Sequence, residues 1–243
     1  MSSSETRGSD IFATTRWTMI VAAGNQQTPQ SNGALEELCR AYWFPLYAYV
    51  RRRGYAREDA EDLTQAFFAR FLAKNCLDRV SAERGRFRAF LLAALKHFLA
   101  NEWDKAQRQK RGGAVPHLSL DWQSADTQFQ LANEVELSPD QAFDREWAVA
   151  LLTKVIERLR AEQAAEGRAA QFEQLKIFLT AGKGTVPQAE VAAALGVHEG
   201  AVRVAAHRLR KRYRQLLREE IAQTLANPAQ VEEEMRALFG AFS

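Results

Sequence analysis

The chain has 243 residues, of which 47% are hydrophobic and 26% charged, a length that suits two small domains better than one. The 33 Lys and Arg nearly balance the 30 Asp and Glu, so the net charge of +3 identifies no partner. Cys39 and Cys76 stand alone without a CxxC motif, which gives almost no support to a disulfide framework or a zinc site and favours buried free thiols in a reducing cytosol.

Residues 1–33 predict a tail with one short helix. The helical part reads TTRWTMIVAAG and is ended by Gly24. No basic segment followed by a long apolar core occurs here, and the longest apolar run, residues 19–23, is too short to span a bilayer. We therefore expect a soluble, cytoplasmic protein that makes no contact with a membrane.

Residues 34–111 have helical periodicity throughout and predict a first small bundle. In the stretch DAEDLTQAFFARFLAKN, residues 59–75, one apolar stripe of a helix holds Ala60, Leu63, Phe67 and Phe71. Phe68 and Leu72 lie roughly 80–120° round from that stripe, beside Glu61 and Gln65. This second stripe is either more of the core or an interface.

The end of this bundle, residues 84–111, interleaves aromatic and basic side chains in the stretch RGRFRAFLLAALKHFLANEWDKAQRQKR. Aromatic rings stack on unpaired bases at roughly 1–3 kcal/mol each, and neighbouring cations hold the backbone, so this mixture favours single-stranded or melting DNA. A bundle core accounts equally well for the apolar members of the stretch. It does not account for Lys96, His97, Asn101 and Trp103.

Residues 112–140 lose periodicity and predict an acidic, flexible linker. From residue 112 to residue 144 there is no Lys or Arg, and the acidic residues are Asp121, Asp126, Glu134, Glu136, Asp140 and Asp144.

Residues 141–222 predict a second small bundle that contains a helix-turn-helix over residues 188–220. Ala192 allows a close helix crossing, Gly196 permits a left-handed turn and Val197 fills the core. The second helix has an apolar stripe made of Val202, Ala205, Ala206, Leu209, Tyr213, Leu216 and Leu217. Its other side carries Arg203, His207, Arg208, Arg210, Lys211, Arg212 and Arg214. Because no acid interrupts residues 201–218, DNA binding is favoured over an ordinary solvated face.

Residues 223–243 predict a C-terminal helical extension. Asn227 is its expected N-cap, Pro228 its first residue, and Val231, Met235, Leu238 and Phe239 its apolar stripe.

In this order, the motifs resemble a bacterial RNA polymerase sigma factor of the sigma-70 family, extracytoplasmic-function group, over roughly residues 34–220. The resemblance implies an all-α fold of two small bundles, residues 34–111 and 141–222, that bind core RNA polymerase and promoter DNA. In that family the DAEDL helix docks on a coiled coil of the largest polymerase subunit. The matching residues here are Asp59, Glu61, Asp62, Gln65, Phe68 and Leu72.

The same resemblance assigns DNA contacts to both bundles. Recognition and melting of the minus-ten element, with a non-template base flipped out, falls to Arg88, Lys96, His97, Asn101, Trp103, Lys105, Arg108, Lys110 and Arg111. Recognition of the duplex minus-thirty-five element falls to His198, Glu199, Arg203, His207, Arg208, Arg210, Lys211 and Arg214. The chain departs from the common ARN…D pattern near His97, which leaves the preferred base open.

Some features leave alternatives open. The linker acids either mimic nucleic acid in the polymerase channel or form a plain tether. The segment at residues 160–185 and the terminal helix are longer than in many members and provide extra packing or a regulatory surface. The regulator is equally open between an anti-sigma protein, the terminal helix and phosphorylation.

Two other classes of protein explain less. An enzyme is disfavoured because the four histidines show no HExxH spacing and AGKGT has Ile177 where a phosphate-binding loop needs glycine. We therefore expect no catalysis, no cofactor and no metal. A free-standing regulator of duplex operator DNA explains the helix-turn-helix but not the Phe68 stripe or the aromatic and basic helix.

Overall fold

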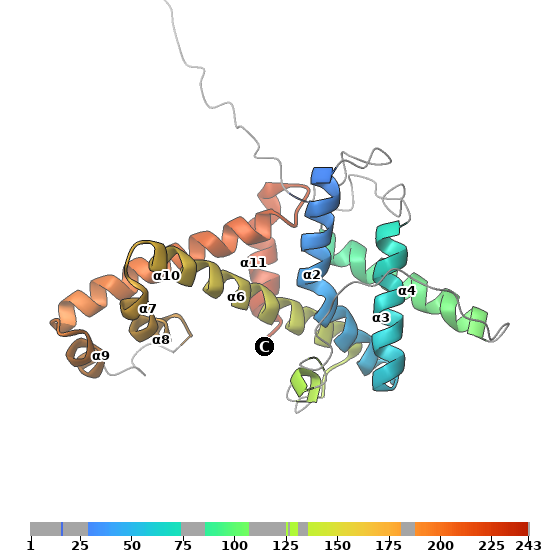
Figure 1. The fold of residues 1–243 in the computed structure, drawn as a ribbon, viewed down its shortest axis with the longest axis horizontal. Helices are drawn as coiled ribbons and strands as arrows, with labels where there is room; N and C mark the ends of the chain where they lie inside the picture. Colours follow the sequence, from blue (N-terminus) through green and yellow to red (C-terminus); the bar gives the residue numbers. More distant parts are fainter. Residues whose placement is uncertain are drawn as a thin grey trace, which may run out of the picture.

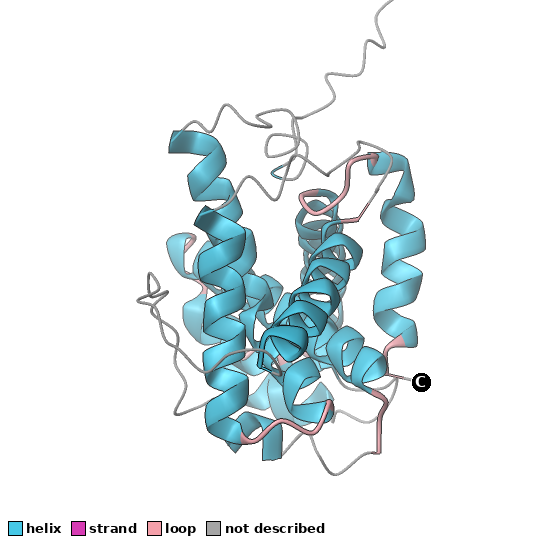
Figure 2. Cartoon of the chain, turned by 90° about the vertical axis from the view of Figure 1, so that its right-hand side faces the viewer, coloured by secondary structure: helices cyan, strands magenta, loops and turns pink. Residues whose placement is uncertain are grey.

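Figure 1 shows the fold in a computed structural model, which describes residue 16 and residues 29–73, 86–106, 125, 127–130, 136–180 and 188–242. All elements in these ranges are helices, and no strand occurs there, as Figure 2 also shows from the side. The predicted all-α fold class is therefore confirmed. No helix in the described ranges is long and apolar enough to cross a membrane.

The first block contains α2 (Pro29–Arg52), α3 (Arg57–Ala73) and α4 (Phe87–Ala106). Aromatic rings hold α3 against α4. The ring centroids of Phe67 and Phe98 are 5.7 Å apart, and those of Phe71 and Phe90 are 5.9 Å apart. These aromatic side chains of α3 and α4 therefore form part of the hydrophobic core and are not available to a ligand.

The second block begins with α6 (Pro139–Ala165), whose start is set by its own sequence. Ser138 and Gln141 form a capping box: the hydroxyl of Ser138 accepts from the backbone N–H of Gln141, and the side chain of Gln141 accepts from that of Ser138. Pro139 occupies the first helical position, where its missing N–H costs nothing.

The two blocks pack against each other along α6. Its first half lies on α2, and the rest lies beside α10 (Glu199–Ala222), so that α6 and α10 form an arm extending from the first block (Figure 1). The indole of Trp147 donates to the hydroxyl of Tyr42 at 3.0 Å, and both side chains are buried. Buried residues of both blocks form one continuous core. The division into two domains stays a prediction.

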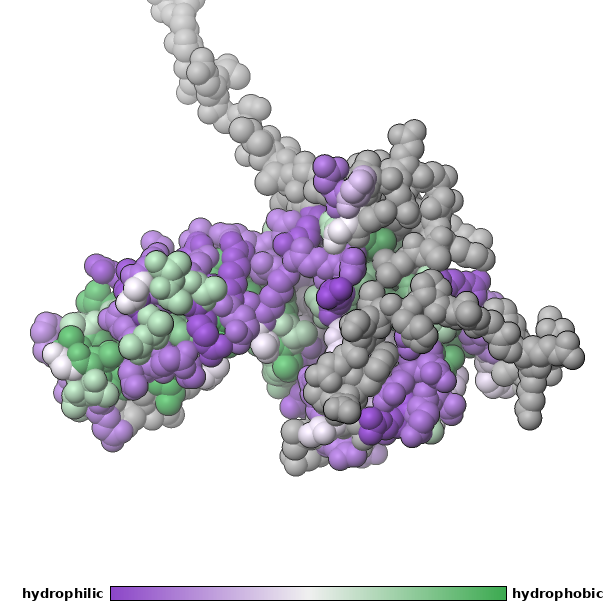
Figure 3. Space-filling view, viewed as in Figure 1, coloured by the Kyte–Doolittle hydropathy of each residue, from purple (hydrophilic) through white to green (hydrophobic). Residues whose placement is uncertain are grey.

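Three short helices, α7 (Ala169–Leu175), α8 (Ile177–Thr180) and α9 (Gln188–Leu195), lie at the far end of the arm (Figure 1). The segment that the sequence left open at residues 160–185 provides packing there, because Phe172, Leu175 and Phe178 are buried beside α10. In Figure 3 this end of the molecule shows hydrophilic and apolar residues interspersed on its surface.

The C-terminal extension begins later than the sequence predicts. Asn227 does accept from the backbone N–H of Ala229, at 2.9 Å, but residues Pro228–Gln230 form a 3₁₀ turn, η2, and α11 spans Val231–Gly240. Met235 and Leu238 are buried as predicted, whereas Phe239 is exposed.

The described part of the linker is anchored on α2. Residues 127–130 are helical, and Ala125 and Phe129 are buried. The Phe129 ring packs against Tyr47, with the guanidinium of Arg51 4.6 Å from its centroid. This part is therefore not a plain solvated tether. The remaining linker acids, Asp121, Asp126 and Glu134, lie outside the described residues.

Candidate nucleic-acid interfaces

The tight turn between α9 and α10 matches the turn chemistry expected from its sequence. Gly196 has a φ of 65°, which glycine adopts without strain. The N–H groups of Gly196 and Val197 bond back to the carbonyls of Ala193 and Ala192, at 3.2 and 3.0 Å, and so end α9. Val197 is 42% exposed, so its predicted place in the core was wrong.

His198 caps the next helix. Its Nδ1 accepts from the backbone N–H of Ala201 at 3.0 Å, which satisfies one of the free N–H groups of the first turn. The exposed imidazole of His198 thus stands at the start of α10.

The exposed side of α10 carries most of the residues predicted to bind duplex DNA. Val202, Ala206, Leu209, Leu216 and Leu217 are buried, and Ala205 and Tyr213 are partly buried, as the stripe predicts. Burial raises the pKa of Tyr213 to about 12. The exposed residues of the predicted set are His198, Glu199, Arg203, His207, Arg208, Lys211 and Arg214.

Arg210, of the predicted set, and Arg212, which the sequence placed on the same basic side, are partly buried. The Nε of Arg210 donates to the carbonyl of Phe178 on α8 at 2.8 Å, and Arg212 makes two bonds of 2.8 and 2.7 Å to Glu162 on α6. Both residues lie next to the buried stripe of α10. Their guanidinium groups therefore reach the neighbouring helices α8 and α6 and form hydrogen bonds there. Arg210 is therefore partly buried and bonded to α8, unlike the exposed residues of the predicted set.

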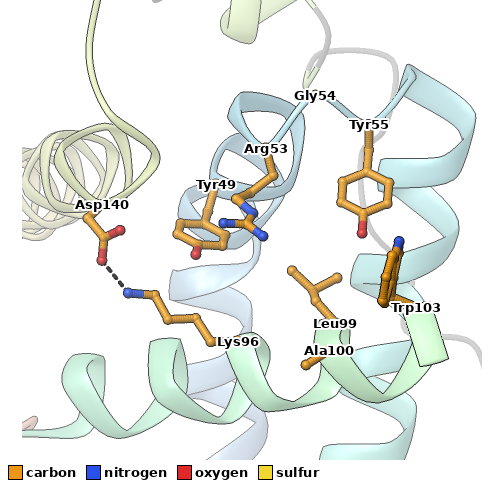
Figure 4. Close-up of a pocket in the computed structure, with 9 residues that line it drawn as sticks. All are labelled: Tyr49, Arg53, Gly54, Tyr55, Lys96, Leu99, Ala100, Trp103 and Asp140. Atoms are coloured by element: carbon orange, nitrogen blue, oxygen red, sulfur yellow. Dashed lines mark hydrogen bonds and ion pairs between the residues drawn. The ribbon is translucent and has the colours of Figure 1, made fainter.

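A second candidate interface is a cavity of about 890 Å³ between the ends of α2 and α4 (Figure 4). Its lining combines aromatic and basic side chains: Tyr49, Arg53, Gly54, Tyr55, Lys96, Leu99, Ala100, Trp103 and Asp140. Trp103 is 59% exposed, and in Figure 4 the Tyr55 hydroxyl points toward its ring. The Lys96 ammonium lies 5.7 Å from the Tyr49 ring centroid.

The cavity joins predicted and unpredicted residues. Lys96, Leu99, Ala100 and Trp103 occupy positions i, i+3, i+4 and i+7 and so share one face of α4. His97 and Asn101 are exposed on α4 but do not line the cavity. Sequence reasoning missed Tyr49 and Tyr55, because only the fold brings the end of α2 beside α4.

Arg88 was wrongly predicted to contact DNA. Its guanidinium is ion-paired with Asp144 of α6 and Glu234 of α11, and it lies 4.6 Å from the Trp147 ring centroid. Its side chain is 13% exposed. Burial acts to lower the pKa of Arg88, but the hydrogen bond and charge of Glu234, with the charge of Asp144, outweigh burial and raise it. Arg88 is thus a charged residue that joins α4 to the second block.

The polymerase-binding prediction on α3 needs a similar correction. Phe68 is 0% exposed, with its ring centroid 5.4 Å from that of Phe67, so it belongs to the core and is not an exposed anchor. The side chain of Leu72 is not among those that the structure describes. Asp59 and Asp62 are exposed, whereas Gln65 and Glu61 are partly buried, and Glu61 accepts from Arg57 at 2.8 Å. The described face of α3 is therefore acidic.

Several predicted residues are not covered. The side chain of Lys105 and all of Arg108, Lys110 and Arg111 lie outside the described residues, as do the AGKGT loop and the helix predicted around Trp17. Among the residues that are described, no three His, Cys, Asp or Glu side chains are grouped so as to hold a metal ion.

Comparisons of the chain with protein-family models, with curated proteins and with solved structures find no match.

Proposed function

We propose that this chain is a sigma-type initiation factor, which binds core RNA polymerase and directs it to promoter DNA. One observation carries the proposal. The chain has two different kinds of candidate nucleic-acid surface, a cationic face on α10 and an aromatic, basic cavity on α4. The start of α10 and helix α4 lie at opposite ends of the molecule (Figure 1). A factor that must hold closed duplex and separated strands at once needs both, and such a role requires a cytoplasmic location.

The exposed face of α10 would hold the duplex. Arg203, Arg208, Lys211 and Arg214 supply positive charge without a competing acid between them. Each phosphate contact they make would release counterions and steepen the salt dependence of binding. The first turns of α10, with His198 and Glu199, would approach the base edges, as in known helix-turn-helix proteins.

The cavity on α4 would hold the melted strand. The exposed ring of Trp103 and the partly buried ring of Tyr55 offer stacking surfaces for unpaired bases. Arg53 offers a charge for the phosphates, and Lys96 would offer a second one on leaving Asp140. Unpairing costs a few kcal/mol, which stacking of two or three bases would offset without a nucleotide cofactor.

The polymerase contact would be made through the acidic face of α3. Asp59 and Asp62 would select a basic partner surface and guide its approach. Phe68 has no part in this version of the contact, because it is buried.

A second candidate, a free-standing regulator of duplex operator DNA, is favoured by that burial. It needs no polymerase anchor on α3, and it uses the same face of α10. A regulator of this class does not explain the cavity on α4.

In vitro transcription separates the two candidates. Bacterial core RNA polymerase, a genomic DNA library and this chain should together yield start sites that are absent without the chain. The Asp59→Asn, Asp62→Asn variant should lose co-purification with core polymerase while keeping its helical circular dichroism and its duplex binding. No new start sites, with duplex binding intact, would leave the regulator as the function.

A further inference from the structure

One apolar side chain stands on the cationic face of α10. Val204 is 51% exposed, whereas the other Val, Leu and Ile residues of this helix, Val202, Leu209, Leu216, Leu217 and Ile221, are all buried. Single exposed apolar residues are ordinary on protein surfaces, so exposure alone means little. The position of Val204 is what distinguishes it.

Val204 lies in the second turn of α10, among the residues proposed to face DNA. On a helix, its neighbours one turn away are Gly200 and Ala201 before it, and His207 and Arg208 after it. Ala201 is partly buried, and the other three are exposed. An apolar spot is thus rimmed by an imidazole and a guanidinium, with Arg203 beside it.

Gly200 leaves the spot open on its N-terminal side. A Cβ added at Gly200 would lie 3.1 Å from Nδ1 of His198, the nitrogen that caps α10, so the cap accounts for the absence of a side chain there. No side chain from position 200 therefore shields Val204.

We infer that Val204 reads the C5-methyl group of a thymine in the major groove. This inference rests on the duplex-binding part of the proposed function. The thymine methyl is the apolar group among the hydrogen-bonding edges of that groove, and residues near the start of the second helix are those that reach base edges. The surrounding cations match the phosphates that flank such a base. One valine is too small a patch to anchor a protein partner by itself.

Thymine-to-uracil replacement tests the inference, since it removes only the methyl group. The probe is the duplex that the full-length chain enriches from a random 20-base-pair library. For the unmodified chain, uracil at one position should weaken binding about fourfold, the value of one buried methyl group. Val204→Ala should bind the thymine and uracil duplexes equally. Alanine favours the helix more than valine does, so this variant folds.

Val197→Ala is the matched control, because Val197 is a similarly exposed valine in the turn before α10. It should keep the fourfold discrimination. Discrimination retained by Val204→Ala, or absent from the unmodified chain, would overturn the inference and leave duplex binding standing. Loss of co-purification with core polymerase by Val204→Ala, with discrimination intact, would also overturn it, in favour of a protein contact. Failure to enrich any duplex would remove the proposed duplex binding as well.

Discussion

The carboxylate of Asp140, the second residue of α6, is ion-paired with the ammonium of Lys96 on α4, at the edge of the aromatic cavity (Figure 4). The hydrogen bond to Asp140 raises the pKa of Lys96, so the ammonium stays charged. Both side chains are about half exposed. Asp140, at the start of the second block, therefore competes with DNA phosphates for the Lys96 ammonium of the first block.

Asp140→Asn should strengthen binding of single-stranded DNA. It frees Lys96 for one more phosphate, which would steepen the log–log salt dependence by about 0.7. Titration of a labelled single strand at several salt concentrations measures both effects. Glu136→Gln makes the same change of charge four residues earlier and serves as the control. An equal gain in affinity for that variant would show that the effect comes from net charge and not from the release of Lys96.

Arg203→Ala and Arg210→Ala should behave differently. Arg203 is exposed on the proposed DNA face, so its loss should flatten the log–log salt dependence of duplex binding by about 0.9. Arg210 bonds to the carbonyl of Phe178, so its loss should leave the slope unchanged and lower the thermal midpoint. Equal slopes for the two variants would contradict the assignment of these arginines.

Glu234→Gln should destabilise the fold strongly. Glu234 is 1% exposed and ion-paired with Arg86 and Arg88, and removing one partner of a buried ion pair costs roughly 3–5 kcal/mol. Urea unfolding measures the change. The matched variant Glu232→Gln removes an exposed acid that pairs with Arg218 and should change the midpoint little. Similar midpoints for both would show that the α4–α11 contact is weak.

Stability should fall in acid partly through Glu220. Burial acts to raise the pKa of this carboxyl, but Lys154, Arg16 and Arg158 outweigh burial and lower it below the ordinary 4.5. The unfolded chain therefore binds the proton more tightly, so this stabilisation is complete above pH 4.5 and is lost as the pH falls through the lower folded value. Glu220→Gln should flatten the acid limb of stability against pH, and an unchanged limb would contradict the shift.

Phe68→Ala should lower the free energy of unfolding by about 3–5 kcal/mol, because it opens a cavity beneath α3. Chemical denaturation measures the loss. A change in unfolding free energy near zero would instead indicate that Phe68 is exposed, as the predicted polymerase interface requires. A charged substitution such as Phe68→Asp tests no interface, since burying a carboxylate there would disrupt the fold.

Much of the helical architecture follows from local pattern. The buried stripe of α10 is readable in the sequence, because helix periodicity involves residues within a few positions of each other. The turn at Gly196 is readable for the same reason. Val197 was misplaced because nothing within the turn itself says whether its side chain points inward or outward.

The candidate sites were predicted less completely, because each depends on residues far apart in the chain. Arg88 forms a hydrogen bond with Glu234, 146 residues away, and no sequence pattern predicts a pairing over that separation. Tyr49 and Trp103 meet in one cavity only because α2 and α4 end side by side.

The amino-acid sequence by itself determined that this protein is helical, where its helices bury their stripes, and that its basic residues gather on two segments. Only the tertiary structure decided which side chains remain available to a partner. The second apolar stripe of α3 closed into the core at Phe68, and Arg88 and Arg210 were taken by neighbouring helices. The physical reason is that helical periodicity is a property of one segment, whereas exposure and ion pairing depend on what every other segment places against it.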